Sequence, residues 1–233
     1  MRRKGIVILG FTVLLFALVT FQSCQSNPEK QLLGTYFHAI SLKDTMTMST
    51  MALEPTTIDA ESWKIASVSL EKTEPFALAD MNKKELDLKK KLEDHVGPVQ
   101  DADDALYAAK EEIKTARTGS ARAAAQKKID EAQIKFDQER EIHRQLQKDY
   151  NEAKAAAVRE EQIAIFSLGA TQMPNIRDFT GTVSSKVVDA NTVGKDGTAR
   201  NYRFYLEKYE LKDEATSITR RGVWKIVKIE TVS

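Results

Sequence analysis

The stretch DALYAAKEEIKTARTGSARAAAQKKIDEA, residues 104–132, contains the turn about which the longest segment of the chain folds. Helical periodicity runs through residues 81–165, and Thr118-Gly119-Ser120 is the only turn signal in the middle of that block. Ser120 is placed to cap the helix that follows. The segment therefore predicts two antiparallel helices with their tip at Thr118, Gly119 and Ser120.

The side chains on the two sides of the turn support this pairing. With Gly119 at the tip, Ile113 faces Ala125 and Leu106 faces Ala132. On the first arm the apolar and small residues step alternately by three and four, at positions 99, 102, 106, 109, 113 and 116. That spacing is the heptad seam of a coiled coil. Almost every residue off the seam is charged or Gln, so we predict a solvated coiled-coil hairpin with arms of roughly 55 Å.

A polar layer interrupts the seam beside Gly97-Pro98. Proline removes a backbone donor and clashes with the preceding turn, which predicts a kink in the first arm. The pairing brings His95 opposite His143, with Glu139 at the same level. These three side chains have the chemistry to bind a metal ion. They also suit a hydrated polar layer that fixes the register of the arms, and we favour this second interpretation. We therefore predict that the protein binds no metal and no cofactor.

The N-terminus has the composition of a targeting segment. Arg2, Arg3 and Lys4 precede the uncharged residues 5–21, and Cys24, the only cysteine, follows. Ser23-Cys24 resembles the end of a bacterial lipoprotein signal, in which a small residue precedes the lipidated cysteine. Two alternatives stay open, an uncleaved signal-anchor helix and simple secretion. The lipoprotein and anchor interpretations both tie residues 25–233 to a membrane outside the cytoplasm.

These interpretations predict a location in the cell envelope. Gln25 is not the acidic residue that retains enterobacterial lipoproteins at the inner membrane, which favours the outer membrane if the source has one. A single cysteine excludes an intramolecular disulfide framework and cysteine-rich zinc modules. Lys plus Arg (35) nearly balances Asp plus Glu (34), so the charge gives no basis for nucleic-acid binding.

Outside the hairpin the pattern is that of an α+β domain. Asn27 and Pro28 begin a helix that ends near Ser41, and Asp44 caps a second short helix that ends before Pro55. Alternating apolar residues predict four strands, at residues 63–72, 179–190, 199–211 and 222–232. The last three follow one another closely, which predicts antiparallel pairing.

Two segments carry a family resemblance: YFHAISLKDTMTMSTMALEP, residues 36–55, and GVWKIVKIE, residues 222–230. They resemble small bacterial lipoproteins with an NTF2-like, cystatin-like domain. The resemblance implies N-terminal helices on a curved four-stranded antiparallel sheet, here interrupted by the hairpin. The expected division is residues 1–23 as signal peptide or anchor, 24–80 as helices and first strand, 81–165 as hairpin insertion, and 166–233 as the remaining strands.

We predict a non-enzymatic, membrane-anchored lipoprotein whose hairpin binds a partner in the cell envelope. The sequence has no Ser-His-Asp signature, phosphate loop or metalloprotease helix, and three histidines leave little acid-base chemistry near neutral pH.

Two alternatives remain. The resemblance implies a small-molecule or catalytic site in the cone of the sheet, with candidate lining residues Trp63, Tyr202, Phe204 and Trp224. We favour the simpler interpretation that these aromatic side chains fill the core. Efflux adaptor proteins also insert a helical hairpin into a β domain, although the flanks of this hairpin lack the glycine-rich lipoyl halves of that family.

Overall fold

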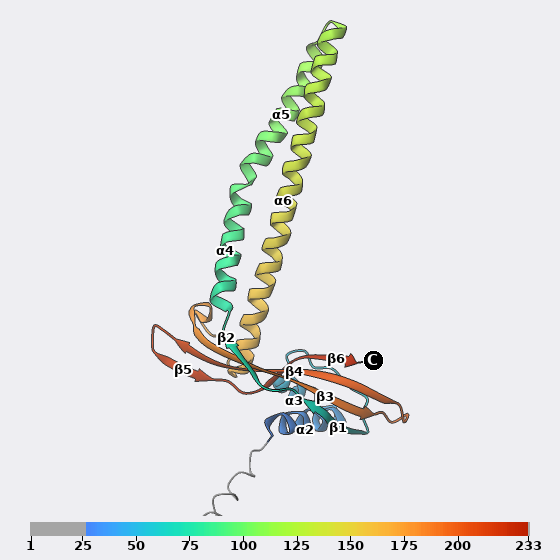
Figure 1. Cartoon of the computed structure of the whole chain (residues 1–233), viewed down its shortest axis with the longest axis vertical. Coiled ribbons are helices and arrows are strands. Elements are labelled where there is room, and N and C mark those ends of the chain that lie inside the picture. Colours follow the sequence, from blue (N-terminus) through green and yellow to red (C-terminus); the bar gives the residue numbers. More distant parts are fainter. Residues whose placement is uncertain (1–26, 233) are drawn as a thin grey trace, which may run out of the picture. The chain divides into compact units, whose positions relative to one another are not determined.

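The computed structural model describes residues 27–232, so the predicted signal segment, residues 1–23, and Cys24 lie outside the described residues. The chain is α+β and divides into two compact units. The sheet unit comprises the described residues up to Glu71, Lys186–Glu207 and the residues from Trp224 onward. The arm unit comprises Lys72–Ser185 and Lys208–Val223. Figure 1 follows the elements along the chain.

Four antiparallel strands build the sheet, and two of them continue into the arm unit. They are β1 (Ser62–Val68), β3 (Thr180–Val193), β4 (Ala199–Asp213) and β6 (Lys225–Val232), in the order β1-β3-β4-β6, and they curl into a half-barrel. Register is set by pairs such as Ile65 with Ala190 and Phe204 with Ile229. The prediction of an α+β fold with a curved four-stranded antiparallel sheet is confirmed.

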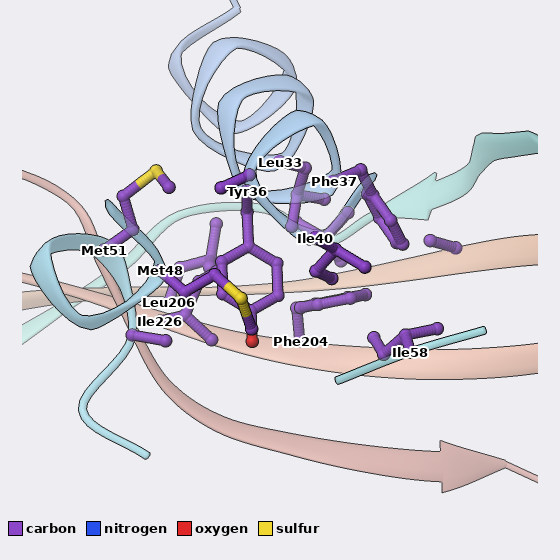
Figure 2. Close-up of a cluster of buried hydrophobic side chains, with 14 residues drawn as sticks. Leu33, Tyr36, Phe37, Ile40, Met48, Met51, Ile58, Phe204, Leu206 and Ile226 are labelled. Atoms are coloured by element: carbon purple, nitrogen blue, oxygen red, sulfur yellow. The ribbon is translucent and has the colours of Figure 1, made fainter. Parts of the chain in front are cut away.

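Two helices pack on the sheet and contribute most of the remaining buried residues of this unit's core. In α2 (Pro28–Ser41), Leu33, Tyr36, Phe37 and Ile40 recur at helical spacing and point into the cluster above the sheet (Figure 2). The ring of Phe204, from β4, meets the Phe37 ring edge-on at 5.8 Å. This contact joins helix and sheet.

The predicted helix starts are partly corrected. Helix α2 begins at Pro28 as predicted, yet the side chain of Asn27 makes no capping hydrogen bond. Helix α3 (Thr45–Met51) is capped by Asp44, whose carboxylate accepts from the Thr47 amide at 3.0 Å. This helix ends well before Pro55, because Ala52 bridges to Ile226 of β6.

The arm unit contains the long helices. They are α4 (Leu78–Asp94), α5 (Val96–Thr115) and α6 (Gly119–Ser167), and α4 and α5 lie side by side with α6 (Figure 1). The 3₁₀ turn η2 (Ile176–Asp178) follows α6. Two short strands that were not predicted complete the unit: β2 (Lys72–Pro75) pairs with β3, and β5 (Ile218–Arg221) pairs with β4. The first predicted strand, residues 63–72, therefore ends at Val68, and β2 begins at Lys72.

The predicted kink takes the form of a helix break. Helix α4 ends at Asp94 and α5 begins at Val96, with His95 between them. Pro98 lies in the first turn of α5, where the missing amide removes no helical hydrogen bond. The break thus falls three residues before the proline that causes it.

Candidate functional site

The turn between α5 and α6 is closed by local hydrogen bonds. The Thr118 hydroxyl accepts from the Ala121 amide at 3.2 Å, which makes Thr118 the N-cap of α6. The Arg122 Nε donates to the Ala116 carbonyl, at the end of α5, at 3.2 Å. Ser120, predicted as the cap, lies inside the helix with its hydroxyl 3.3 Å from that of Thr118. The prediction of the cap was wrong by two residues.

Every side chain at this tip is open to solvent. Residues 117–124 are all exposed, and a Cβ added to Gly119 would meet no atom within 4 Å. The side chains in this run are small or basic: Arg117, Thr118, Ser120, Ala121, Arg122, Ala123 and Ala124. The tip therefore offers a narrow, small-residue surface with two guanidinium groups.

Small residues bring the arms together below the tip. Ala102, Leu106 and Ala109 of α5 and Ala125 of α6 are buried. Between the arms Lys128 Nζ lies 2.6 Å from Glu112 Oε1, so these turns of the two helices are level with each other. Small side chains at a seam allow the helix axes to approach closely.

The polar layer lies at the break between α4 and α5. His95 Nε2 is 3.0 Å from Glu139 Oε2, and the His95 and His143 rings stack with their centroids 6.0 Å apart. The Nδ1 atoms of both histidines are buried and make no hydrogen bond within the described chain. No group of three or more His, Cys, Asp or Glu side chains among residues 27–232 is arranged to hold a metal ion. His95, His143 and Glu139 therefore lie at one level of the arms, beside the break between α4 and α5.

A surface groove of about 490 Å³ lies next to this layer. Phe136 lines its apolar part, with the Arg140 guanidinium 5.4 Å from the ring centroid. The remaining lining residues are Val99, Gln100, Asp103, His143, Arg144 and Gln147. The groove is open and mixed in charge, so it does not single out one ligand.

Two contacts at the far end of α6 join it to segments of the same unit that are distant in sequence. Ser167 is buried, donates to the Val223 carbonyl at 2.9 Å and accepts from the Tyr209 amide at 3.2 Å. Arg177 donates to Glu161 of α6 and to Glu85 of α4. The bond to Glu161, with Glu85 adding to it, raises the pKa of the Arg177 guanidinium. Sequence reasoning missed both contacts, because their partners are far apart in the chain.

The four candidate pocket residues belong to the core of the sheet unit. Phe204 is fully buried, and Trp63 stacks on Phe37 at 4.8 Å. Tyr202 and Trp224 are partly buried and pack against the same cluster. Trp63, Tyr202 and Trp224 thus keep part of their surface exposed, whereas Phe204 does not.

Cys24 lies outside the described residues. In the part of the chain that is described, no helix combines the length and the hydropathy that crossing a membrane requires. No protein family, no curated protein and no solved structure matches the chain.

Proposed function

We propose that this chain is an extracytoplasmic lipoprotein, anchored through Cys24, that binds a protein partner with its helical hairpin and carries out no chemistry. The observation that carries the proposal is the tip: residues 117–124 are exposed at the end of two long helices. Helix α6 alone has 49 residues, roughly 74 Å at 1.5 Å per residue. A helix pair of this length with a solvated tip is suited to reach a partner.

We further propose that the arms form an antiparallel coiled coil and that the sheet unit is an NTF2-like domain. The spacing of Ala102, Leu106 and Ala109, four residues and then three, supports the first part. The position of α2 on a curled sheet supports the second. A catalytic or ligand-binding cone has less support, because the aromatic residues expected to line it are engaged in core packing.

The test is site-specific photocrosslinking from residues 118 and 120 in native membranes. We expect one strong adduct from the tip and a much weaker one from a matched position on the same helix, Lys148, which is exposed far from the tip. An adduct of equal strength from position 148, or none from either tip position, contradicts a role for the tip.

The anchor is tested separately. Cys24→Ser is expected to block maturation and leave a full-length precursor, because lipidation requires the thiol. Ser26→Ala, two residues further on, is the matched control and should mature normally. Identical processing of Cys24→Ser and the unaltered protein would favour an uncleaved signal anchor.

A further inference from the structure

The hairpin is charged in two separate zones. Residues 113–129, around the turn, contain five basic residues and no acidic one, which gives +5. Residues 101–112 and 130–141, the adjoining parts of the two arms, contain ten acidic and three basic residues, which gives −7. We call the first zone the basic tip and the second the acidic band. The whole chain has a net charge of +1, so this separation is local to the hairpin.

The acidic band exposes apolar side chains that are framed by carboxylates. Tyr107 of α5 is 66% exposed, and its neighbours three and four residues away include Asp103, Asp104 and Glu111. Ile134 of α6 is 59% exposed and has a similar frame. That second frame consists of Asp130, Glu131 and Asp137. An apolar centre with an acidic rim suits a docking segment that brings basic side chains with apolar stems.

The basic tip has two arginines that are not neutralised within the hairpin. Three of its five cations, the lysines, form ion pairs with the acidic band: Lys114 with Glu111, Lys127 with Glu131, and Lys128 with Glu112. Arg122 uses Nε on a backbone carbonyl, and Arg117 is exposed and makes no ion pair with any described residue. A guanidinium matches a carboxylate with two parallel hydrogen bonds, so these arginines are suited to an acidic protein surface.

We propose that the basic tip of one copy docks on the acidic band of a second copy. Asp104 lies in α5 and Arg117 lies just beyond its end, so the two are separated by about 20 Å at 1.5 Å per residue. Two hairpins that overlap antiparallel by this length place each tip on the other's band, and one two-fold axis relates both contacts. This proposal rests on the proposed function, because it takes the hairpin as a binding arm. It adds that the partner is a second copy of the chain.

The composition of the tip disfavours a lipid surface as the occupant. Residues 114–128 include no Leu, Ile, Val, Met or aromatic side chain. Helices that lie in a membrane interface insert such residues among the headgroups. With three lysines already paired, two arginines remain for anionic headgroups, fewer than the roughly four to eight cations of a typical lipid-binding cluster.

The proposed contact is small and electrostatic. Two narrow hairpins that overlap by about 20 Å bury less surface than a stable dimer interface needs, so the association is weak. Attraction between exposed charges is screened by salt with a range of about 10 Å at 0.1 M. Self-association is therefore expected to weaken steeply with ionic strength.

A charge-swap experiment on the full chain in detergent tests the proposal by sedimentation velocity. One variant reverses the tip, Arg117→Glu with Arg122→Glu, and a second reverses the band, Asp103→Lys with Asp104→Lys. Each variant alone places like charges opposite each other, so its dissociation constant should rise about tenfold or more. A 1:1 mixture restores opposite charges at both contacts, and its affinity should return to within about threefold of the unaltered chain.

The matched control is Lys84→Glu with Lys90→Glu, which makes the same charge change on exposed positions of α4 away from the tip. This control should associate like the unaltered chain, and circular dichroism confirms that all variants fold. A monomeric unaltered chain at low salt, or a mixture that associates no better than its components, overturns the proposal. Photo-adducts from position 118 to a foreign protein or to lipid would also overturn it. A foreign-protein adduct would leave the proposed function standing, whereas the absence of every adduct would reject both.

Discussion

Lys186 of β3 places its ammonium 5.1 Å from the centre of the Trp224 ring. The same nitrogen lies 3.5 Å from a Glu29 oxygen and 3.4 Å from a Glu71 oxygen. The side chains of Lys186 and Glu29 are only 15% and 12% exposed. Since Glu29 is in the first turn of α2, this partly buried pair attaches the start of the helix to the sheet.

Lys186→Met is expected to destabilise the sheet unit by about 2 kcal/mol. The methionine keeps an apolar stem, but it leaves the buried Glu29 carboxylate without its cation and removes the contact with the indole. Urea unfolding measures the loss. Adding Glu29→Gln should recover part of it, because the unpaired charge is then gone. Equal stability of Lys186→Met and the unaltered protein would show that the pair contributes nothing.

Gly222→Ala is expected to destabilise the arm unit by about 2 kcal/mol, because overpacking forces the surroundings to shift. A Cβ at position 222 would lie 2.4 Å from Ser167 Oγ and 2.9 Å from the Ser167 carbonyl oxygen. Gly119→Ala is the matched control, because its Cβ meets no atom within 4 Å. Thermal unfolding followed by circular dichroism distinguishes the two, and similar melting temperatures would argue against close packing at the end of α6.

Thr118→Ala should weaken the start of α6 by about 1 kcal/mol, the usual effect of losing an N-cap. Ser120→Ala should change the stability by less than about 0.5 kcal/mol, because the Ser120 hydroxyl contacts only that of Thr118 among the described residues. Amide hydrogen exchange at the first turn of α6 reports the difference directly. Faster exchange in Ser120→Ala than in Thr118→Ala would reverse the assignment of the cap.

Asp189 gives the sheet unit a dependence on acid. Arg203 donates to its carboxylate at 2.7 Å, and this bond, with a contribution from Ser67, holds the pKa of Asp189 below its ordinary value. Because the pKa of Asp189 is lower in the folded state, its bond with Arg203 stabilises the fold fully above about pH 4. This stabilisation is lost as the pH falls through the folded-state pKa of Asp189. Arg203→Met should therefore flatten the dependence of the unfolding free energy on pH below about 4.

The control for this titration is Lys64→Met, a substitution at an exposed lysine of β1. It should keep the acid dependence of the unaltered protein. If the unfolding free energy of Arg203→Met falls with pH as steeply as that of the unaltered protein, the guanidinium does not set the pKa of the Asp189 carboxylate.

The parts of the fold that were predictable are those with local signals. Pro28 at a helix start, Asp44 as a cap and the alternating apolar residues of β4 each act within a few residues of sequence, so sequence alone places them. The pairing of His95 with His143 was predicted by counting residues outward on both sides of the turn at Gly119.

The missed parts depend on contacts that are distant in sequence. Strands β2 and β5 have four residues each, all exposed, and thus show no apolar alternation. Their strand structure comes from pairing with β3 and β4. Likewise, Arg177 bonds a carboxylate 92 residues earlier in the chain, and no local pattern predicts such a partner.

The break at His95 makes the two arms mechanically unequal. One arm is a single continuous helix of 49 residues, whereas the other is interrupted and lacks a continuous ladder of backbone hydrogen bonds. A continuous helix bends only gently, and sharp bends form at such interruptions. A sideways force on the tip is therefore expected to bend the arms at the level of His95. Helix α6 resists this bending, and the interrupted arm, α4 with α5, yields to it.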